Sequence, residues 1–229
     1  MDIRILTNAE VVAHEAAKLV AAFARKEVAA RGRFILAVSG GTTPWLMLRA
    51  LGKEDVPWEN VHVVQVDERI APAGHPDRNL THLKESLLEY APLKEDHIHA
   101  MPVESADLDY AALRYGETLC KIAGNPPVID LVHLGLGPDG HTASLIPGDP
   151  VLNLDLQDVA ITGVYQGRTR MTLTYPVINR ARNILWVVTG SEKVSMLNRL
   201  INGDASIPAG RVCQDNAIIL ADNDAAGKL

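Results

Sequence analysis

The sequence predicts an α/β protein with three layers, in which a mainly parallel sheet carries helices on both faces. Apolar runs of strand length alternate along the chain with segments whose apolar residues recur at helical spacing. The apolar runs are continuous rather than alternating with polar residues, as is typical of strands buried on both faces of a parallel sheet. No linker or internal repeat interrupts the 229 residues, so we expect a single domain over residues 1–229.

The first half of the chain begins with a helix over 8–31, for which Asn8 is a suitable N-cap. A buried strand over 33–38 runs into a glycine-containing turn at 39–44, and helical spacing resumes over 45–51. The remaining elements predicted here are a strand over 61–66 that ends in Asp67-Glu68-Arg69, a helix over 80–90, a short strand over 98–101 and a helix over 107–123.

The second half is organised around the apolar run 130–134, which stops at the turn Gly135-Leu136-Gly137-Pro138-Asp139-Gly140. We expect a short helix next, ended by Pro147, and a frayed tail over 222–229. The other predicted elements are strands over 159–164, 170–174, 183–189 and 217–221, and helices over 176–182 and 192–201.

The composition is that of an ordinary soluble globular protein, with 47% hydrophobic and 22% charged residues. No apolar run is long enough to cross a membrane, and Met1-Asp2-Ile3-Arg4 lacks the pattern of a secretory signal, so a cytoplasmic location is expected. Cys120 and Cys213 have no metal-ligand spacing and are expected to be reduced thiols. A net charge of −6 argues against nucleic acid as a partner, so an anionic substrate would need a local cluster of cations.

His141 is the first candidate for catalysis. It follows the turn after the strand over 130–134, at the edge of the sheet where open α/β proteins bind ligands. Imidazole has an unperturbed pKa of about 6.5, so it exchanges protons near neutral pH. Asp67 or Asp139 could orient the imidazole, although Asp139 could instead accept backbone N–H groups of its own turn. The alternative for His141 is that it only caps the helix expected after it.

A second candidate site is the loop of Ser39, Gly40, Gly41 and Thr42, which joins a strand to the start of a helix. Free backbone N–H groups and hydroxyls at such a position suit a phosphate group. Cations also follow the predicted strands, and arginine or lysine there could contact an anion, although a solvent-facing cation is the alternative for each one. These cations are Arg69, Arg168, Arg170 and Lys193.

These motifs resemble, in order, those of the 6-phosphogluconolactonase family, which is part of a wider superfamily of sugar-phosphate isomerases and deaminases. The motifs are Ser39-Gly-Gly-Thr-Thr-Pro44, Val66-Asp-Glu-Arg69 with Asn79 downstream, Gly135-Leu-Gly-Pro-Asp-Gly-His-Thr-Ala-Ser-Leu145, Arg170-Met-Thr-Leu-Thr174 and Gly190-Ser-Glu-Lys193. The chain departs from the family pattern at two points. Tyr165-Gln166-Gly167-Arg168-Thr169-Arg170 stands where the family has a Lys-Pro-Pro sequence before its arginine-threonine motif, and the given sequence ends soon after the last predicted strand.

The resemblance implies a Rossmann-like fold and hydrolysis of 6-phospho-D-glucono-1,5-lactone, with no redox cofactor and no required metal. It implies that His141 is the acid–base residue. It also implies substrate or phosphate contacts from Ser39, Gly40, Gly41, Thr42, Asn79, Arg170 and Lys193. We expect the lactone to be the binding partner of a monomer or weak homo-oligomer, with no membrane or nucleic acid involved.

The expected mechanism has His141 take a proton from an attacking water and return it to the ring oxygen, with Arg69 or Arg170 stabilising the oxyanion. One alternative is a glucosamine-6-phosphate deaminase or aldose–ketose isomerase with Asp67 as the carbon base. The segment 142–147 lacks the glutamate of the deaminase pattern, which favours the lactonase. A second alternative is a non-catalytic sugar-phosphate-binding effector domain. Ser144 has no nucleophile-elbow sequence around it, which argues against a serine nucleophile there.

Overall fold

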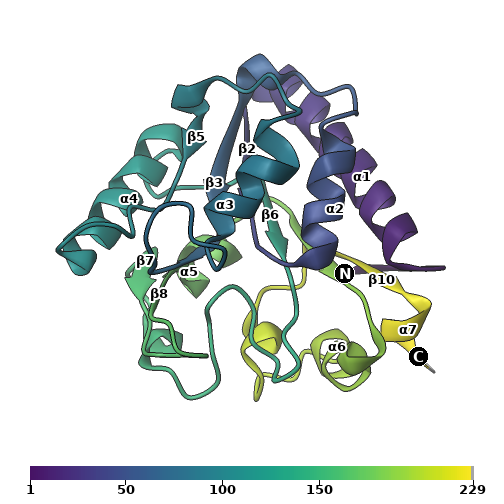
Figure 1. The fold of residues 1–229 in the computed structure, drawn as a ribbon. Coiled ribbons are helices and arrows are strands. Elements are labelled where there is room, and N and C mark those ends of the chain that lie inside the picture. Colours follow the sequence, from purple (N-terminus) through teal and green to yellow (C-terminus); the bar gives the residue numbers. More distant parts are fainter. Residues whose placement is uncertain (228–229) are drawn as a thin grey trace.

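A computed structural model describes residues 1–227. Its main sheet has seven strands, and all its neighbouring pairs are parallel, which confirms the predicted mainly parallel sheet (Figure 1). In spatial order the strands are β1 (Asp2–Leu6), β10 (Ala217–Asp222), β9 (Ile184–Val188), β6 (Leu131–Leu134), β2 (Phe34–Val38), β3 (Val61–Gln65) and β5 (Ile98–His99). The edge strand β1 is an element that the sequence pattern did not predict.

Helices cover both faces of this sheet, as predicted. On one face α1 (Ala9–Arg31) and α2 (Thr42–Leu51) pack over the sheet, and on the other face lie α4 (Leu108–Ala123), α5 (Tyr175–Asn179) and α6 (Val194–Ile201). Strand β2 shows the division, because its side chains alternate between two cores: Leu36 packs beneath α1 and α2, and Ile35 packs toward α4.

Local signals define the ends of the long helices. The Asn8 side chain accepts a hydrogen bond from Val11 N at 3.0 Å and begins α1, and Gly32 ends it in the left-handed conformation with φ of 73°. Asp107 caps α4 in the same way as Asn8 caps α1. The helix predicted over 80–90 is present as α3 (Asn79–Leu83) followed by a π-helical turn over Lys84–Leu88.

A second, three-stranded antiparallel sheet packs below the first, in the order β4 (Asp67–Arg69), β8 (Arg170–Leu173) and β7 (Val159–Ile161). The prediction that Asp67-Glu68-Arg69 ends the strand over 61–66 was therefore wrong. Val66 N donates to Val38 O in the main sheet, and Val66 O accepts from Leu173 N, so the chain changes sheets at this residue.

The short helix expected after His141 is also absent. Residues 142–145 form a tight turn in which Leu145 N donates to Thr142 O at 2.8 Å and Ala143 has a φ of 51°. Long-range hydrogen bonds compete with a helix here, because Thr142 Oγ1 donates to Gly135 O and Ser144 N donates to Thr172 Oγ1. A 3₁₀ turn over Pro150–Asn153 follows later in the chain.

The tail predicted to fray is ordered as far as the structure describes it. Strand β10 continues to Asp222, whose carboxylate accepts a hydrogen bond from Ala225 N and caps α7 (Asn223–Ala226). Residues 228 and 229 lie outside the described residues. Among the helices of residues 1–227, none combines the length and apolar character that crossing a membrane requires.

Candidate active site

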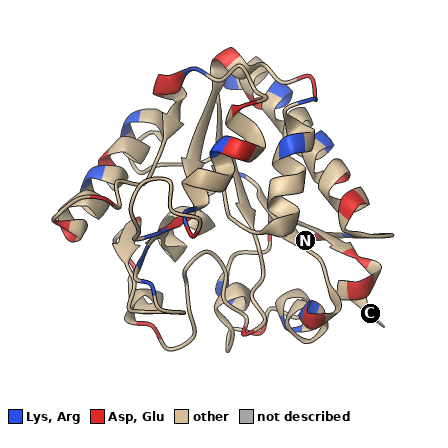
Figure 2. Ribbon diagram, viewed as in Figure 1, with Lys and Arg blue, Asp and Glu red and all other residues tan. Residues whose placement is uncertain are grey.

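A cleft of about 310 Å³ opens at the carboxyl ends of the main strands, where they meet β4 and β8 of the second sheet. Of the eleven residues proposed from the sequence, ten line this cleft; the exception, Asp139, lies behind His141. The ten are Ser39, Gly40, Gly41, Thr42, Asp67, Arg69, Asn79, His141, Arg170 and Lys193. Figure 2 shows basic and acidic segments adjoining in the second sheet, from which Asp67, Arg69 and Arg170 come.

His141 is held from behind by Asp139. The Asp139 Oδ1 atom lies 2.5 Å from His141 Nδ1 and also accepts the His141 backbone N–H at 3.1 Å. With Nδ1 donating to the carboxylate, Nε2 carries the lone pair of the neutral imidazole. Burial raises the pKa of Asp139, but the hydrogen bonds from His141 and from Tyr165 outweigh it and leave that pKa below its ordinary value. Asp139 is therefore a carboxylate that can orient the imidazole.

The turn before His141 requires glycine. A Cβ at Gly137 would lie 2.1 Å from His141 Nδ1, and Gly140 has a φ of 84°, in the left-handed region. Gly137 N donates to His141 O at 2.8 Å, which closes the turn. The glycines of this motif thus let the imidazole pack against the backbone of its own loop.

The loop between β2 and α2 presents an uncapped helix start to the cleft. Gly41 is the N-cap residue of α2 with a φ of 130°, and no side chain of residues 1–227 caps the first helical amides. A Cβ at Gly40 would lie 2.1 Å from Asn79 Oδ1, so only glycine allows this close approach. The Ser39 hydroxyl donates to His133 O at 2.9 Å, so its proton already has a partner in the main chain. Backbone amides at the start of α2 are therefore the donors best placed for an anion.

Two arginines of the second sheet face each other across a β-pair, because Arg69 is in register with Arg170. Arg69 Nη1 donates to Asp77 O and to Asn79 Oδ1. Arg170 is 4% exposed, and the hydrogen bonds of its guanidinium to other described residues are long, at 3.5 Å to Ser144 Oγ and 3.4 Å to Gln166 Oε1. The Nε atoms of both arginines are buried without a hydrogen-bond partner among the described residues. Burial lowers the pKa of Arg170, and the charge of Asp67 opposes this change.

Asp67 is buried and both of its carboxylate oxygens are engaged. Ser144 Oγ donates to Oδ2 at 2.6 Å, and Asn79 Nδ2 donates to Oδ1 at 3.2 Å and to the Asp67 carbonyl at 3.0 Å. Ser144 thus binds a carboxylate and lies within reach of Arg170, rather than beside a histidine as a nucleophile would. Asn79 positions its neighbours Asp67 and Arg69 as well as lining the cleft.

The remaining cations divide between the cleft and the surface. The Lys193 side chain is 19% exposed, lines the cleft and lies 3.6 Å from Glu192 Oε1. Arg168, in contrast, pairs with Asp77 at 2.9 Å and does not line the cleft. Within residues 1–227, no group of three His, Cys, Asp or Glu side chains is arranged to hold a metal ion.

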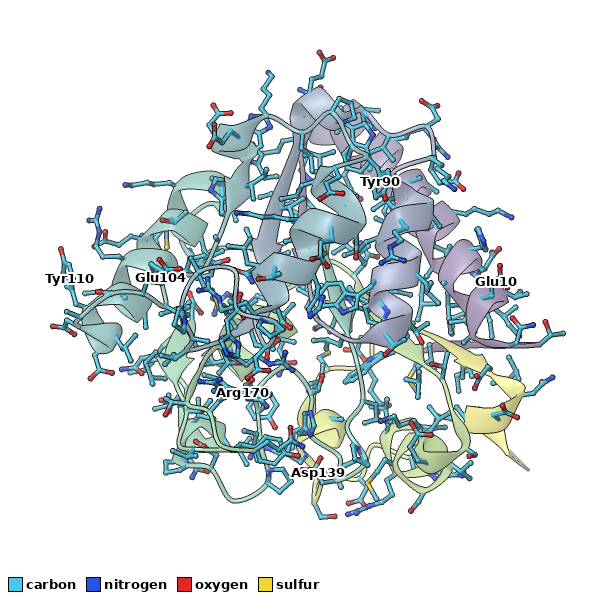
Figure 3. All side chains as sticks on the ribbon, in the orientation of Figure 1. Glu10, Tyr90, Glu104, Tyr110, Asp139 and Arg170 are labelled. Atoms are coloured by element: carbon cyan, nitrogen blue, oxygen red, sulfur yellow. The ribbon has the colours of Figure 1, made fainter. Side chains whose placement is uncertain are left out.

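Sequence patterns missed several residues that shape the site. Thr189 lines the cleft and its hydroxyl lies 2.6 Å from Thr43 Oγ1; its place at the carboxyl end of a predicted strand was a usable signal. Ser144 bridges Asp67 and Arg170, and Tyr165 donates to Asp139 Oδ2 at 3.0 Å. No local pattern signals these two contacts, because their partners are distant in the chain. Figure 3 labels Asp139 and Arg170, which lie on the same side of the molecule, below the main sheet.

The fold and the cleft define an α/β protein whose cleft, at the carboxyl edge of its parallel sheet, is lined by a histidine, two arginines and a lysine. The family described as glucosamine-6-phosphate isomerases/6-phosphogluconolactonase matches residues 7–220. The chain belongs to this family, which confirms the resemblance seen in the sequence motifs.

Relatives named 6-phosphogluconolactonase match most of the chain. The one from Synechocystis sp. is 36% identical over 208 residues, which is 89% of this chain and 86% of the relative. The one from Mycobacterium tuberculosis is 34% identical over 242 residues, covering 100% of this chain and 98% of the relative.

Solved structures share the fold. The 6-phosphogluconolactonase from Trypanosoma cruzi superposes with a TM-score of 0.88 at 24% identity, covering 100% of this chain and 96% of that one. A monomeric glucosamine-6-phosphate deaminase superposes with a TM-score of 0.86 at 17% identity, covering 99% of both chains. Lactonase and deaminase thus share this architecture, so the fold alone does not choose between the two activities.

Proposed function

We propose that this protein hydrolyses 6-phospho-D-glucono-1,5-lactone to 6-phospho-D-gluconate, the lactonase step of the oxidative pentose phosphate pathway. The observation that carries the proposal is the pair of His141 and Asp139, joined at 2.5 Å, beside a cleft that also contains an uncapped helix start and three cations. Relatives named 6-phosphogluconolactonase over most of the chain support the same activity.

The proposed reaction starts with the attack of water on C1 of the lactone. His141 Nε2 takes one proton from this water as the C1–O bond forms, and the carbonyl electrons move onto the oxyanion. Asp139 holds Nδ1–H and stabilises the imidazolium that results. When the tetrahedral intermediate collapses, the bond between C1 and the ring oxygen breaks, and the ring oxygen takes the proton from His141. The product carboxylic acid then loses its own proton to solvent.

Arg170 is the cation we assign to the oxyanion. Its guanidinium is buried, and among residues 1–227 its side-chain hydrogen bonds are 3.4 and 3.5 Å long, so it keeps hydrogen-bonding capacity for a ligand. Arg69 is more occupied, since its Nη1 donates to Asp77 O and to Asn79 Oδ1. We assign Arg69 to holding Asn79 and the cleft wall.

The phosphate of the substrate would bind at the start of α2, with Lys193 as a neighbouring charge. Amides of Gly41, Thr42 and Thr43 are near the positive end of the helix dipole, and no side chain caps them. Anchoring this remote group would orient C1 toward His141, so phosphate binding energy contributes to the rate. The Ser39 hydroxyl stabilises the loop by donating a hydrogen bond to His133 O.

Two observations speak against the deaminase or isomerase alternative. A carbon base needs a carboxylate oxygen free to approach the substrate, but Ser144 and Asn79 donate to the two oxygens of Asp67. The segment after His141, Thr142-Ala143-Ser144-Leu145-Ile146-Pro147, contains no carboxylate. The single domain, the cytoplasmic location and the monomer or weak homo-oligomer remain predictions.

The test is a coupled assay. Glucose-6-phosphate dehydrogenase generates the lactone, 6-phosphogluconate dehydrogenase reports the product, and the spontaneous hydrolysis rate is subtracted. We expect the wild-type protein to accelerate hydrolysis well above this background and His141→Ala to lose at least about 100-fold in kcat. The exposed His14 on α1 provides the control His14→Ala, which should keep full activity.

Absence of acceleration by the wild-type protein would contradict the lactonase. Ammonia release from glucosamine 6-phosphate would then test the deaminase alternative. Binding of sugar phosphates with no turnover of either substrate would favour the effector domain.

A further inference from the structure

Tyr165 contacts three residues of the candidate site, Asp139, His141 and Arg170, from outside the cleft. Its hydroxyl donates to Asp139 Oδ2 at 3.0 Å, on the opposite carboxylate oxygen from the one that binds His141. Its ring lies edge-on to His141, with centroids 5.4 Å apart and an interplanar angle of 67°. Arg170 Cζ lies 5.1 Å from the centroid of the same ring. Tyr165 itself does not line the cleft, so it would act through these neighbours.

A tight hairpin turn sets the position of Tyr165. Tyr165 N donates to Arg168 O at 2.9 Å and Arg168 N returns to Tyr165 O at 3.1 Å. The two residues between them, Gln166 and Gly167, have φ values of 49° and 76°, the pattern of a type I′ turn. This turn is the segment in which the chain departs from the pattern of its family.

The far side of the hairpin is anchored to another loop. Arg168 Nε donates to Asp77 Oδ2 at 3.0 Å, and Arg168 Nη2 lies 3.2 Å from His75 Nε2. The Asp77 loop also binds Arg69 through the Asp77 carbonyl. The hairpin that carries Tyr165 is therefore held to the Asp77 loop through Arg168 rather than projecting as a free loop.

The phenol is a suitable donor for a carboxylate. Burial and the neighbouring Asp139 carboxylate raise the pKa of Tyr165 above its ordinary value, so the hydroxyl keeps its proton at neutral pH. Asp139 is about one-third exposed, so without this bond its carboxylate could rotate away from His141 and bind water instead. The Tyr165 hydroxyl holds one oxygen so that the other stays on Nδ1.

We propose that Tyr165 is a positioning residue for His141, holding Asp139 so that the imidazole keeps Nδ1–H toward the carboxylate and Nε2 toward the substrate. The proposal rests on the proposed lactonase function. The proposal gives a role to the turn in which the chain departs from the family pattern. Tyr165 holds the second carboxylate oxygen of Asp139, whereas both hydrogen bonds from His141 go to the first, Oδ1.

The kinetic test is a double-mutant cycle. Tyr165→Phe removes the hydroxyl and keeps the ring against His141 and Arg170. We expect it to lower kcat about 10-fold or more and to leave KM within about twofold, since a hydrogen bond to a charged group contributes this much. In the Asp139→Asn background the same substitution should change kcat less than about twofold, because the Asp139 carboxylate through which Tyr165 is proposed to act is absent. Tyr110→Phe, on the exposed face of α4, is the matched control and should behave as wild type.

A wild-type kcat in Tyr165→Phe would overturn the proposal. An equal loss in both backgrounds would also overturn it, because Tyr165 would then act on something other than Asp139. Unfolding midpoints of wild type, the two single variants of the cycle and the double variant show whether a loss of kcat reflects a general loss of stability.

A second readout needs no substrate. Long-range ¹H–¹⁵N correlation spectra of histidine-labelled protein report the tautomer of each imidazole, and His141→Ala assigns the signals of His141. We expect one Nδ1–H tautomer in the wild-type protein and a mixture of tautomers in Tyr165→Phe. Identical His141 signals in the two proteins would overturn the positioning role. A wild-type protein without lactonase activity would contradict the proposed function, and these spectra would still decide the role of Tyr165.

Discussion

Gly137 packs against the imidazole of His141 so closely that a Cβ at residue 137 would lie 2.1 Å from Nδ1 and 2.7 Å from Cγ. Real Cβ atoms do not approach other atoms to this distance, so any side chain here must displace the ring. The same imidazole is held by Asp139 at 2.5 Å. The backbone of residue 137 therefore sets the orientation of the proposed acid–base residue.

Gly137→Ala should lower kcat by about 100-fold, because a displacement of about 1 Å at a catalytic group has this effect. Coupled-assay kinetics at saturating lactone measure the loss. Gly116→Ala is the control, since a Cβ at this helical glycine meets nothing within 4 Å and should leave kcat unchanged. A fully active Gly137→Ala variant would show that activity does not depend on the observed position of the His141 ring.

Lys193→Met should weaken substrate binding more than turnover. The ammonium is proposed to neutralise the phosphate, and a charged hydrogen bond of about 1.5–3 kcal/mol corresponds to a KM about 10-fold higher or more. Steady-state kinetics give kcat and KM, and inorganic phosphate should also become a weaker competitor. The control Lys18→Met, at an exposed position on α1, should change neither kcat nor KM. A loss confined to kcat would place Lys193 at the reacting centre instead.

Glu68→Gln should destabilise the fold strongly. The Glu68 carboxylate is 0% exposed and accepts hydrogen bonds from the backbone N–H groups of Arg69, Asn79 and Leu80. Removing one charge of a buried pair, here with Arg78 at 3.1 Å, costs about 3–5 kcal/mol. Urea unfolding monitored by circular dichroism measures the change.

Glu104→Gln is the matched control for this experiment. Glu104 also contacts Arg78, at 2.9 Å, but its side chain is 56% exposed. Exposed ion pairs contribute about 1 kcal/mol or less, so the free energy of unfolding should change little. Equal effects of the two substitutions would contradict the organising role of the Glu68 carboxylate.

The free energy of unfolding should decrease as the pH falls below about 6.5. Burial lowers the pKa of His133 from 6.5 to about 4. Between these two values the unfolded chain binds a proton that the folded protein does not, so protonation favours unfolding. The contribution of His133 is complete above its unfolded pKa, and between about pH 7.5 and pH 5 its loss amounts to about 2 kcal/mol.

His133→Asn tests this assignment. In the wild-type protein Ser39 N donates to His133 Nδ1 at 3.2 Å, and the amide oxygen of asparagine can replace Nδ1 as the acceptor. Urea unfolding at about pH 7.5 and about pH 5 should show a smaller pH dependence in the variant than in wild type. The free energy of unfolding of the variant should still depend on pH to some extent. Burial, together with the charges of His97 and His99, also lowers the pKa of His62 to about 4. An unchanged pH dependence would refute the role of His133.

The sequence by itself determined the parallel sheet, the long helices and the edge at which the site lies. These features depend on local signals: continuous apolar runs for buried strands, Asn8 and Gly32 at the ends of α1, and glycine turns after β2 and β6. Because parallel strands place their carboxyl ends at one edge, motifs far apart in the chain could be assigned to one cleft without coordinates.

Only the tertiary structure decided how the side chains in that cleft are paired. The chain crosses between sheets at Val66, and this crossing puts Asp67 beside Ser144, a residue 77 positions away. The turn after His141 replaces a helix because its hydroxyls and amides bond to distant partners. Tyr165 reaches Asp139 across 26 residues. Hydrophobic periodicity encodes which face of an element is buried but not the register between elements, and the hydrogen bonds of the site depend on that register.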